Sequence, residues 1–217
     1  MFSTSMTLND FLFLLQGAGV TLSITFWAVL GGTLLGLGFG LALAVAPWWL
    51  TAPLGAFLDL LRSVPLLIQF VLANSFKSII GLNVSAFVVG CIVLSLYTSS
   101  YCAEIVRGGI LAVPLTTRRA ARSLGLSWGQ DLTQIVFPIA LRIMLPSWIG
   151  LSLGVMKDTS LVLWIGIIEL LRSSQIIVTR IQEPLFVLIV AGLIYFLISF
   201  PISRLGAHLE KKWREYD

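Results

Sequence analysis

The stretch FLFLLQGAGVTLSITFWAVLGGTLLGLGFGLALAVAPWWLTAPLGAFL, residues 11–58, contains no Asp, Glu, Lys or Arg. Residues 78–103 and 184–203 are also free of charged side chains. A membrane-spanning helix needs about 20 mostly apolar residues, so each of these stretches is long enough to cross a bilayer. Over the 217 residues the hydrophobic share is 58% and the charged share is 11%, against about a quarter charged in ordinary globular chains. The composition excludes a soluble protein and leaves no room for a sizeable soluble domain.

Charged and turn-forming residues divide the chain into five expected spans. Pro47 and Pro53 close the first span, Lys77 ends the second, and Glu104 and Arg107 end the third. We therefore expect an all-α integral membrane fold that forms a single transmembrane domain over residues 1–217. Its spans are placed at about residues 17–46, 54–76, 84–106, 134–156 and 184–203.

The basic residues predict the orientation, because Lys and Arg accumulate in cytoplasmic loops. With five spans and the N-terminus outside, the inner side receives ten of the 14 basic residues, which are Arg62, Arg107, Arg118, Arg119, Arg122, Arg142, Arg204, Lys211, Lys212 and Arg214. The outer side keeps Lys77, Arg172 and Arg180. We expect the N-terminus outside and the C-terminus in the cytoplasm.

A stripe of small residues lies on the first expected span. Gly32, Gly36 and Gly40 follow one another at intervals of four, a spacing that lets a second helix backbone approach closely. Gly150 and Gly154 repeat this spacing in the fourth span. We predict that these glycines serve helix packing, within the chain or across a subunit interface.

The polar loop at about residues 108–133, between the third and fourth spans, is expected to hold a short helix. Thr116 or Thr117 can cap its N-terminus, and Gly125 is a natural residue just past its C-terminus. The helix carries three arginines and two small residues, namely Arg118, Arg119, Arg122, Ala120 and Ala121. Two interpretations stay open on physical grounds. The helix docks a cytoplasmic protein that approaches the alanines closely, or its arginines hold lipid headgroups at the membrane surface.

One charged pair interrupts the apolar sequence between residues 143 and 166. It consists of Lys157 and Asp158, followed by Thr159 and Ser160. A charge at membrane depth costs a few kcal/mol and marks a functional site by default. Neighbouring residues do not face each other on a regular helix, so each charge finds a partner on another helix or the helix breaks here.

Broken helices near mid-depth are places where transporters bind charged ligands. A zwitterionic amino acid needs an anion for its ammonium group and a cation for its carboxylate, and Asp158 and Lys157 supply one of each. The alternative is a network at the outer edge, with Lys157 reaching towards water.

The other charged segments have simpler expected roles. Residues 169–183, with Arg172 and Arg180, are placed on the outer rim as a solvated face. Glu104 and Arg107 are three residues apart near the inner end of the third span. They are expected to form an i,i+3 ion pair, with a gate as the alternative.

Four segments together resemble the permeases of ATP-binding-cassette (ABC) importers. Ala120-Ala121, three residues, Gly125, nine residues and then IVFP at 135–138 match the EAA loop of those permeases. RSVPLLIQ (62–69), SYCAEIVRGGI (100–110) and KDTSL (157–161) are similar to segments of the branch for histidine, glutamate, glutamine, arginine and opines. The matches occur in the family's order and spacing and cover most of the chain.

The resemblance implies a transmembrane subunit that imports polar or charged amino acids by alternating access across a bacterial inner membrane. The implied partners are a cytoplasmic ABC ATPase dimer, a second permease subunit (identical or homologous), an extracytoplasmic amino acid-binding protein and membrane lipid, without nucleic acid. No cofactor binds this chain, since ATP and Mg belong to the ATPase. The alternative is a passive channel or a structural membrane subunit without ATP coupling.

The expected site residues form two groups, and the resemblance implies the coupling role for Arg119, Ala120, Ala121 and Gly125. The ATPase-coupling residues are Arg118, Arg119, Ala120, Ala121, Arg122 and Gly125. The substrate-pathway residues are Lys157, Asp158, Thr159, Ser160, Gln69 and Glu104. The loop departs from the family pattern, because Arg119 stands where Glu is usual and Thr116-Thr117 replace Gly-Gln. A charge reversal at a docking surface fits an ATPase with an acidic groove, or a transporter in which the second subunit's loop dominates the coupling.

No catalytic or metal site is expected in this chain. Residues 150–154 spell G-x-S-x-G, but that motif needs a strand-to-helix turn with a base in reach, and the only histidine, His208, lies in the C-terminal tail. The sequence contains no GxxxxGK[ST] phosphate loop and no Gly-Lys dipeptide. An ATP-driven role therefore requires a separate ATPase.

Overall fold

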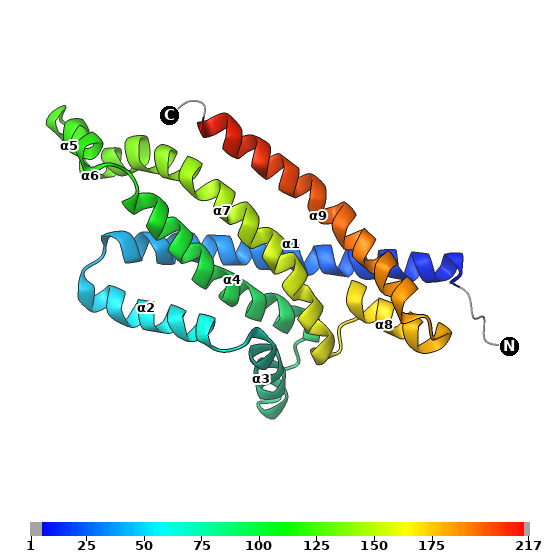
Figure 1. Cartoon of the computed structure of the whole chain (residues 1–217). Helices are drawn as coiled ribbons and strands as arrows, with labels where there is room; N and C mark the ends of the chain where they lie inside the picture. Colours follow the sequence, from blue (N-terminus) through cyan, green and yellow to red (C-terminus); the bar gives the residue numbers. More distant parts are fainter. Residues whose placement is uncertain (1–5, 215–217) are drawn as a thin grey trace.

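The computed structural model describes residues 6–214, and every regular element in this range is a helix (Figure 1). In chain order the elements are α1 (Leu8–Val45), α2 (Trp48–Ser63), α3 (Leu66–Ile79), α4 (Ala86–Leu111), α5 (Leu115–Ser123), α6 (Trp128–Gln130), the π-helix η1 (Asp131–Val136), α7 (Phe137–Asp158), the 3₁₀-helix η2 (Thr159–Ile165), α8 (Leu170–Ile181) and α9 (Pro184–Arg214).

Four apolar helical stretches in the described range are long enough to cross a membrane. They are α1, α4, the run from Trp128 to Ile165, and Pro184–Lys212 of α9. The bent pair α2–α3 brings the number to five when it counts as one span. The all-helical membrane fold predicted from the sequence is thus confirmed.

Two helices extend beyond the spans expected from the sequence. The first helix begins at Leu8 rather than at residue 17, because Thr7 and Asp10 form a capping box in which the Thr7 N–H and hydroxyl both donate to Asp10 Oδ2, at 2.8 and 2.7 Å. The last helix continues to Arg214 instead of ending at residue 203. The basic tail is therefore part of a long helix.

The second predicted span, residues 54–76, is two helices that meet at 100°. Pro65 explains the break, because a proline disfavours the helical conformation of the preceding residue, and Val64 is extended, with φ −85° and ψ 127°. The Gln69 side chain then donates to two carbonyls at the bend, Leu61 O at 2.7 Å and Val64 O at 2.8 Å. These hydrogen bonds replace partners that the helix break removes.

The longest helix contact is between α1 and α4, and the glycine stripe lies in it. A Cβ atom on Gly36 would lie 2.5 Å from Cys102 Cβ, and one on Gly40 would lie 2.5 Å from the Ala103 carbonyl oxygen. Gly32 faces Thr98 in the same way. Only glycine lets the backbones of α1 and α4 approach this closely. By contrast, Gly150 and Gly154 have no atom of the described chain within 4 Å of a Cβ position.

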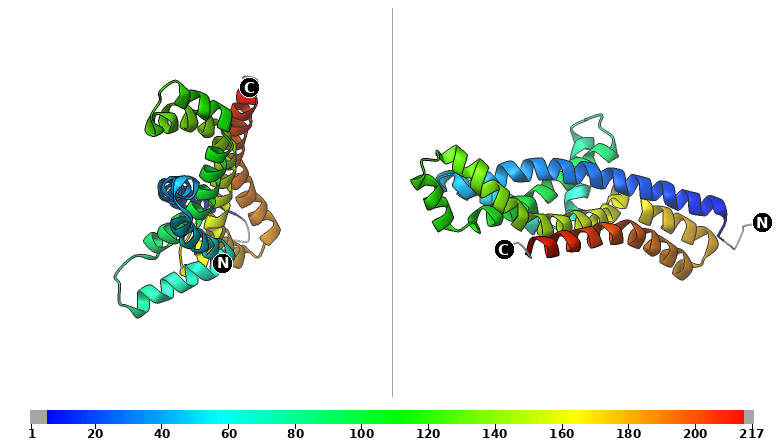
Figure 2. Two further views of the ribbon diagram at one scale, coloured as in Figure 1. Left: turned by 90° about the vertical axis from the view of Figure 1, so that its left-hand side faces the viewer. Right: turned by 90° about the horizontal axis from the view of Figure 1, so that it is seen from above.

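The short helices α5 and α8 lie at opposite ends of the molecule. In the view from above, α5 lies at one end, and α8 lies at the other end with the start of α1 (Figure 2). The end of α9 points towards the α5 end (Figure 1). The short elements α5 and α8 therefore cap opposite ends of the long helices.

Candidate functional site

The helix α5 ends as predicted, but it starts earlier. Gly125 has φ +88° and follows the last helical turn, with the Leu126 N–H donating to Ala121 O at 3.3 Å and the Gly125 N–H donating to Arg122 O at 3.0 Å. This is the 6→1 and 5→2 pattern that terminates many helices at a glycine. The N-cap is Pro114 rather than Thr116 or Thr117.

Arg118 attaches α5 to the start of the following span. Its Nε and Nη2 both donate to Asp131 Oδ2, at 3.1 and 3.0 Å. Asp131 belongs to η1 and is fully buried. Removing one partner of a buried ion pair leaves an uncompensated charge, so α5 and η1 are held together as a unit. Arg118 is therefore committed to a contact within the chain.

The other arginines of α5 remain on its surface. Arg119 and Arg122 are exposed, Ala120 is exposed and Ala121 is buried. Two large apolar side chains accompany the arginines, since Leu115 is 64% exposed and Leu124 is 83% exposed. The free face of α5 thus combines positive charge with apolar surface, and the helix carries no acidic residue.

A network of four charges joins α2 to α4. Glu104 accepts from Arg107 Nε at 3.1 Å, which is the i,i+3 pair that their spacing predicts. It also lies 3.5 Å from Arg62 Nη2. Arg62 contacts Asp59 and donates to Ser100 O at 3.3 Å. The charge of Glu104 is therefore balanced by two arginines.

The side chain of Gln69 is also engaged within the chain. Both hydrogens of its amide are donated to carbonyls at the α2–α3 bend.

The segment that follows α7 changes helix type directly after the Lys157-Asp158 pair. The α-helix ends at Asp158, and η2 runs from Thr159 to Ile165 before Gly166, which has φ +86°. Lys157 is exposed, and Asp158 and Ser160 are half-buried. The Tyr97 hydroxyl of α4 lies near enough to Asp158 to interact with its charge, and it forms a 3.3 Å hydrogen bond with Tyr101. Lys157 and Asp158 are thus accessible at the break between two helix types.

Thr159 differs from its three neighbours because it is fully buried. Its hydroxyl donates to Met156 O at 2.7 Å. The structure therefore brings Lys157, Asp158 and Ser160 to one accessible segment and turns Thr159 inwards.

Glu169 is also fully buried, so the prediction of a solvated rim is wrong for this residue. It caps α8, with Oε1 accepting from the Arg172 N–H at 2.7 Å and Oε2 from the Leu171 N–H at 2.8 Å. The Tyr195 hydroxyl of α9 donates to Oε2 at 3.2 Å. Glu169 lies between the apolar spans, and burial raises its pKa while these hydrogen bonds oppose the rise.

The helix α8 also lies tightly against α1. The Leu170 N–H donates to Thr21 Oγ1 at 3.3 Å. A Cβ atom on Gly17 would lie 2.5 Å from Ser173 Oγ and 2.9 Å from Glu169 O. At the far end of α8, Arg180 forms an ion pair with Asp10. Both ends of α8 are therefore fastened to α1.

With this geometry established, the chain was compared with known proteins. The profile of the family described as "Binding-protein-dependent transport system inner membrane component" matches residues 32–215. The chain belongs to this family. The permease is 34% identical over 221 residues to the probable amino-acid ABC transporter permease protein YckA of Bacillus subtilis (strain 168), covering 100% of this chain and 96% of the relative. It is 30% identical over 211 residues to the octopine transport system permease protein OccM of Rhizobium meliloti, covering 93% and 86%.

Solved structures agree with this assignment. A chain from the crystal structure of an amino acid ABC transporter with histidines has a TM-score of 0.85 and 28% identity, covering 96% of the permease and 99% of that chain. A chain of the MetNI methionine ABC transporter, at 20% identity and a TM-score of 0.78, covers 94% and 99% and shares the fold. The permease is a multi-pass inner-membrane protein and the transmembrane subunit of an ATP-driven importer, a class that works with an ATPase and a binding protein.

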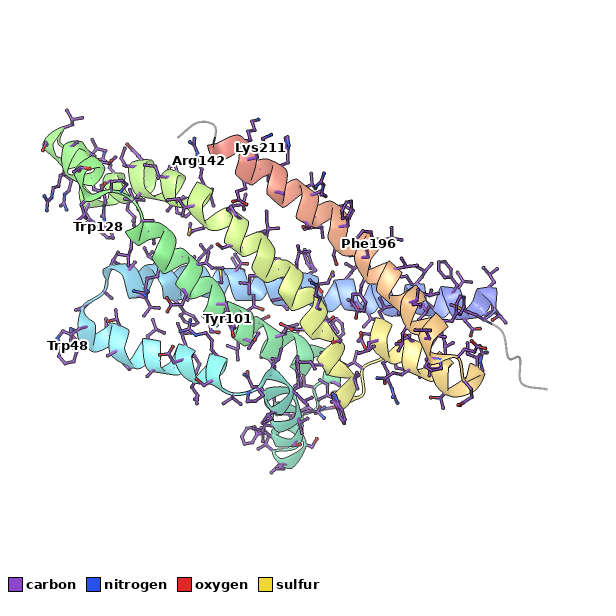
Figure 3. The ribbon with its side chains drawn as sticks, viewed as in Figure 1. Trp48, Tyr101, Trp128, Arg142, Phe196 and Lys211 are labelled. Atoms are coloured by element: carbon purple, nitrogen blue, oxygen red, sulfur yellow. The ribbon has the colours of Figure 1, made fainter. Side chains whose placement is uncertain are left out.

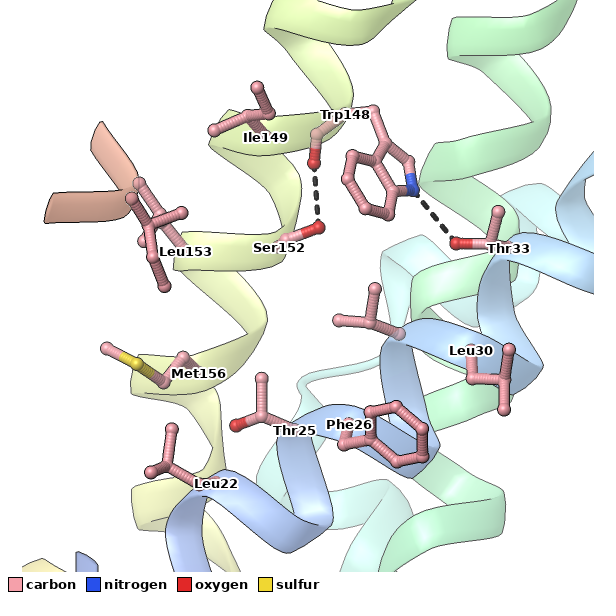
Figure 4. A pocket seen from close by; sticks show the side chains of 12 residues that line it. Leu22, Thr25, Phe26, Leu30, Thr33, Trp148, Ile149, Ser152, Leu153 and Met156 are labelled. Atoms are coloured by element: carbon pink, nitrogen blue, oxygen red, sulfur yellow. Dashed lines mark hydrogen bonds between the residues drawn. The ribbon is translucent and has the colours of Figure 1, made fainter. Parts of the chain in front are cut away.

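A large apolar groove of about 410 Å³ between α1 and α7 offers no polar handle for a zwitterion. The Trp148 indole N–H donates to Thr33 Oγ1 at 2.8 Å, and the Ser152 hydroxyl donates to Trp148 O at 2.9 Å (Figure 4). The Thr25 hydroxyl donates to Thr21 O at 2.7 Å. Because these groups already have partners, an ammonium or carboxylate in the groove would lose its hydration without compensation. We therefore do not assign substrate binding to this groove.

Sequence reasoning missed Asp131 and Glu169, and both left a signal. Each is an isolated carboxylate at the start of an apolar helical run, as in QDLTQIVF and IIELL. A single acidic residue in such a position favours a buried cap or an ion pair over a solvated face. The partners Arg118 and Tyr195 are distant in sequence or on another helix, so the signal identifies the carboxylate and leaves its partner open.

Proposed function

We propose that the permease imports a polar amino acid, with its N-terminus outside, its C-terminus in the cytoplasm and α5 seated on the ATPase. The observation that carries this proposal is the position of α5. It is a short basic helix fixed to the end of the bundle by the buried Arg118–Asp131 pair. When a docked protein moves such an element, η1 and α7 move with it, because the ion pair keeps the element attached to them.

The distribution of charge supports this orientation. Arg142 of α7 and Lys211 of α9 are labelled at the ends of their helices that point towards α5 (Figure 3). The exposed tryptophans Trp48 and Trp128 lie towards the same end. Basic residues accumulate on the cytoplasmic side, and tryptophans favour the membrane interface. The α5 end is therefore the cytoplasmic end in this proposal.

The free face of α5 calls for an acidic groove in the ATPase. Arg119 and Arg122 are exposed, and α5 has no carboxylate of its own to neutralise them. Complementary charge across an interface selects the partner and speeds association. We therefore expect carboxylates of the ATPase opposite Arg119 and Arg122, and an apolar pocket that receives Leu124, which is 83% exposed. The alternative is that the loop of the second permease subunit dominates the coupling.

The proposed substrate class rests on the relatives and on the accessible Lys157-Asp158 segment. Relatives are described as permeases for glutamine, octopine and glutamate/aspartate. In the permease, Asp158 would bind the ammonium group and Lys157 the carboxylate of an α-amino acid, with Ser160 beside them. Gln69 and Glu104 are already engaged within the chain, and so in this proposal they shape the pathway without contacting substrate.

The remaining partners follow from the same proposal. A second permease subunit, identical or homologous, completes the pathway, and lipid surrounds the pair. The binding protein delivers substrate at the α8 end. ATP and Mg bind the ATPase, and this chain holds no cofactor of its own.

Purification and reconstitution test the proposal. An ATPase is expected to co-purify in mild detergent, and reconstituted complex with its binding protein is expected to hydrolyse ATP faster with one or a few polar amino acids. A matched pair of variants tests docking. Arg119→Glu is expected to weaken ATPase association, whereas Arg142→Glu, an exposed arginine outside α5, is expected to leave it unchanged. Equal association of all three proteins would overturn docking through α5, and no response to any polar amino acid would overturn the substrate class.

A further inference from the structure

A buried polar cluster joins four elements at the outer end of the molecule. It contains Thr21 of α1, Thr159 of η2, Glu169 before α8 and Tyr195 of α9. Thr21, Thr159 and Glu169 are fully buried. This outer cluster lies directly behind the accessible Lys157-Asp158 segment, because Thr159 is the next residue in the chain.

The Tyr195 hydroxyl is the centre of the outer cluster. It donates to Glu169 Oε2 at 3.2 Å, and the hydroxyls of Thr21 and Thr159 lie near it. Glu169 in turn holds the first N–H groups of α8, and Thr21 accepts the N–H of Leu170. The Tyr195 hydroxyl therefore lies where the α8 cap, α1 and the first residue of η2 meet, and its hydrogen bond is to the α8 cap.

The packing around the outer cluster leaves little freedom for its parts to move separately. Gly17 allows α1 to approach Ser173 and the Glu169 carbonyl to a distance that a Cβ would block. The Asp10–Arg180 ion pair fastens the other end of α8 to α1. Leu170, Ile177 and Ile181 of α8 are buried against α1 and α9 residues such as Leu14 and Val187. A force on α8 therefore reaches Thr159 through hydrogen bonds and packed side chains.

The opposite face of α8 is exposed and carries two arginines beside apolar surface. Arg172, Ile176, Thr179 and Arg180 line a shallow hollow of about 580 Å³ on the surface. In the proposed function this is the end where the binding protein delivers substrate. The same helix thus has a partner-facing side and a side attached to the substrate segment.

We propose that Glu169 and Tyr195 are positioning residues that transmit contact of the binding protein with α8 to the Lys157-Asp158 segment. The inference rests on the proposed function, because it needs a binding protein at the α8 end. Docking shifts α8, the carboxylate of Glu169 carries the shift to the Tyr195 hydroxyl, and Thr159 carries it to η2. The outer cluster then sets the geometry of Lys157 and Asp158 without touching substrate.

The test uses the complete transporter in nanodiscs, with its ATPase and its cognate binding protein loaded with amino acid. Tyr195→Phe removes one hydroxyl, and Glu169→Gln removes the charge at nearly constant size. Ser199→Ala is the control, since it removes a hydroxyl one turn further along α9 that donates to Tyr195 O at 2.6 Å. The readouts are basal ATP hydrolysis, hydrolysis with loaded binding protein, and the affinity of the binding protein for the transporter.

Tyr195→Phe and Glu169→Gln are expected to lower the ratio of stimulated to basal hydrolysis by at least about fivefold, the lower range of coupling between distant sites. Basal hydrolysis and binding-protein affinity are expected to change less than about twofold, and Ser199→Ala is expected to behave as the unmodified permease. The double variant is expected to be no worse than the worse single variant, because both changes act on the same Glu169–Tyr195 contact.

Three outcomes would overturn the proposal: an unchanged ratio, an equal loss of basal and stimulated hydrolysis, or fully additive effects in the double variant. If the unmodified transporter itself gives no stimulation by the binding protein, the proposed function fails with it. If the binding protein stimulates the unmodified transporter and the variants equally, the proposed role of the outer cluster is refuted and the proposed function is not.

Discussion

Two buried carboxylates, Asp131 and Glu169, attach a short helix to the bundle at its two ends, and they are stabilised in different ways. Asp131 faces the guanidinium of Arg118 at 3.0 Å. Glu169 takes part in no salt bridge within residues 6–214 and is held by two backbone N–H groups and the Tyr195 hydroxyl. Both side chains are fully buried.

The two ends of the molecule are therefore expected to respond differently to a force on their short helices. An ion pair between α5 and η1 is a single strong contact that is either made or broken. The dipoles around Glu169 come from α8 and α9 and can adjust together as these helices move. The inner end is therefore suited to holding α5 rigid, and the outer end is suited to passing on a shift.

The largest expected effect is from breaking the inner ion pair. Arg118→Ala leaves the Asp131 carboxylate buried without its cation, which costs about 3–5 kcal/mol in comparable buried pairs. Thermal unfolding in detergent is expected to occur at a clearly lower temperature, with loss of the co-purifying ATPase. Adding Asp131→Asn to this variant is expected to restore part of the stability. If Arg118→Ala melted like Arg119→Ala, whose side chain is exposed, the ion pair would not be what holds α5.

The outer carboxylate is expected to be less sensitive. Glu169→Leu removes the cap of α8 and leaves the Leu171 and Arg172 N–H groups without partners, at a cost of about 1–3 kcal/mol. Hydrogen exchange at the start of α8 is expected to quicken, while exchange in α5 stays unchanged. Equally faster hydrogen exchange in α8 and α5 would show that the two ends of the molecule do not respond independently.

Helix approach at the outer end gives a third test. Gly17→Ala places a methyl group 2.5 Å from Ser173 Oγ and 2.9 Å from a backbone carbonyl. Forcing extra volume into such a contact costs about 1–3 kcal/mol. Gly19→Ala is the matched control, because nothing lies within 4 Å of its Cβ position. A lower melting temperature for Gly17→Ala alone is expected, and equal melting of both variants would contradict the close packing of α1 on α8.

The smallest expected effect concerns pH. Because burial raises the pKa of Glu169 above its ordinary value of 4.5, the folded permease holds this proton more tightly than the unfolded chain does. The contribution of Glu169 to stability is therefore largest below pH 4.5 and is lost as the pH rises through the folded-state pKa. Glu169→Gln is expected to flatten this part of the profile of melting temperature against pH. An unchanged profile would show that Glu169 has the same proton affinity in both states.

Much of the fold followed from the sequence, because apolar length and charge placement determine helices in a bilayer. The charge-free stretches predicted α1, α4 and α9, and the three glycines spaced four residues apart on α1 are in close contact with α4. The break at Pro65 was missed, since the hydrophobic window runs through it and only the backbone restriction before proline reveals it. Helix ends were missed where caps decide them, as at Thr7 and Pro114.

The helix α5 and the break after Lys157-Asp158 were predictable from the sequence, whereas the contacts of their neighbours were not. Motif spacing located α5 and the Lys157-Asp158 segment, because both are short and continuous in sequence. The partners of Asp131 and Glu169 come from other elements, and packing against α1 and α9 determines them. Hydropathy alone places a lone Glu such as Glu169 on a rim, whereas its two backbone donors and Tyr195 make burial possible.

If ATP drives amino acid import through α5, uptake into proteoliposomes must depend on ATP and on the attachment of α5. The complete transporter is reconstituted with ATP trapped inside and binding protein loaded with labelled amino acid outside. We expect uptake that requires both ATP and binding protein and that Arg118→Ala abolishes, while Gly19→Ala leaves it intact. Uptake that proceeds without ATP, or that persists unchanged in Arg118→Ala, would show that α5 does not couple ATP hydrolysis to import.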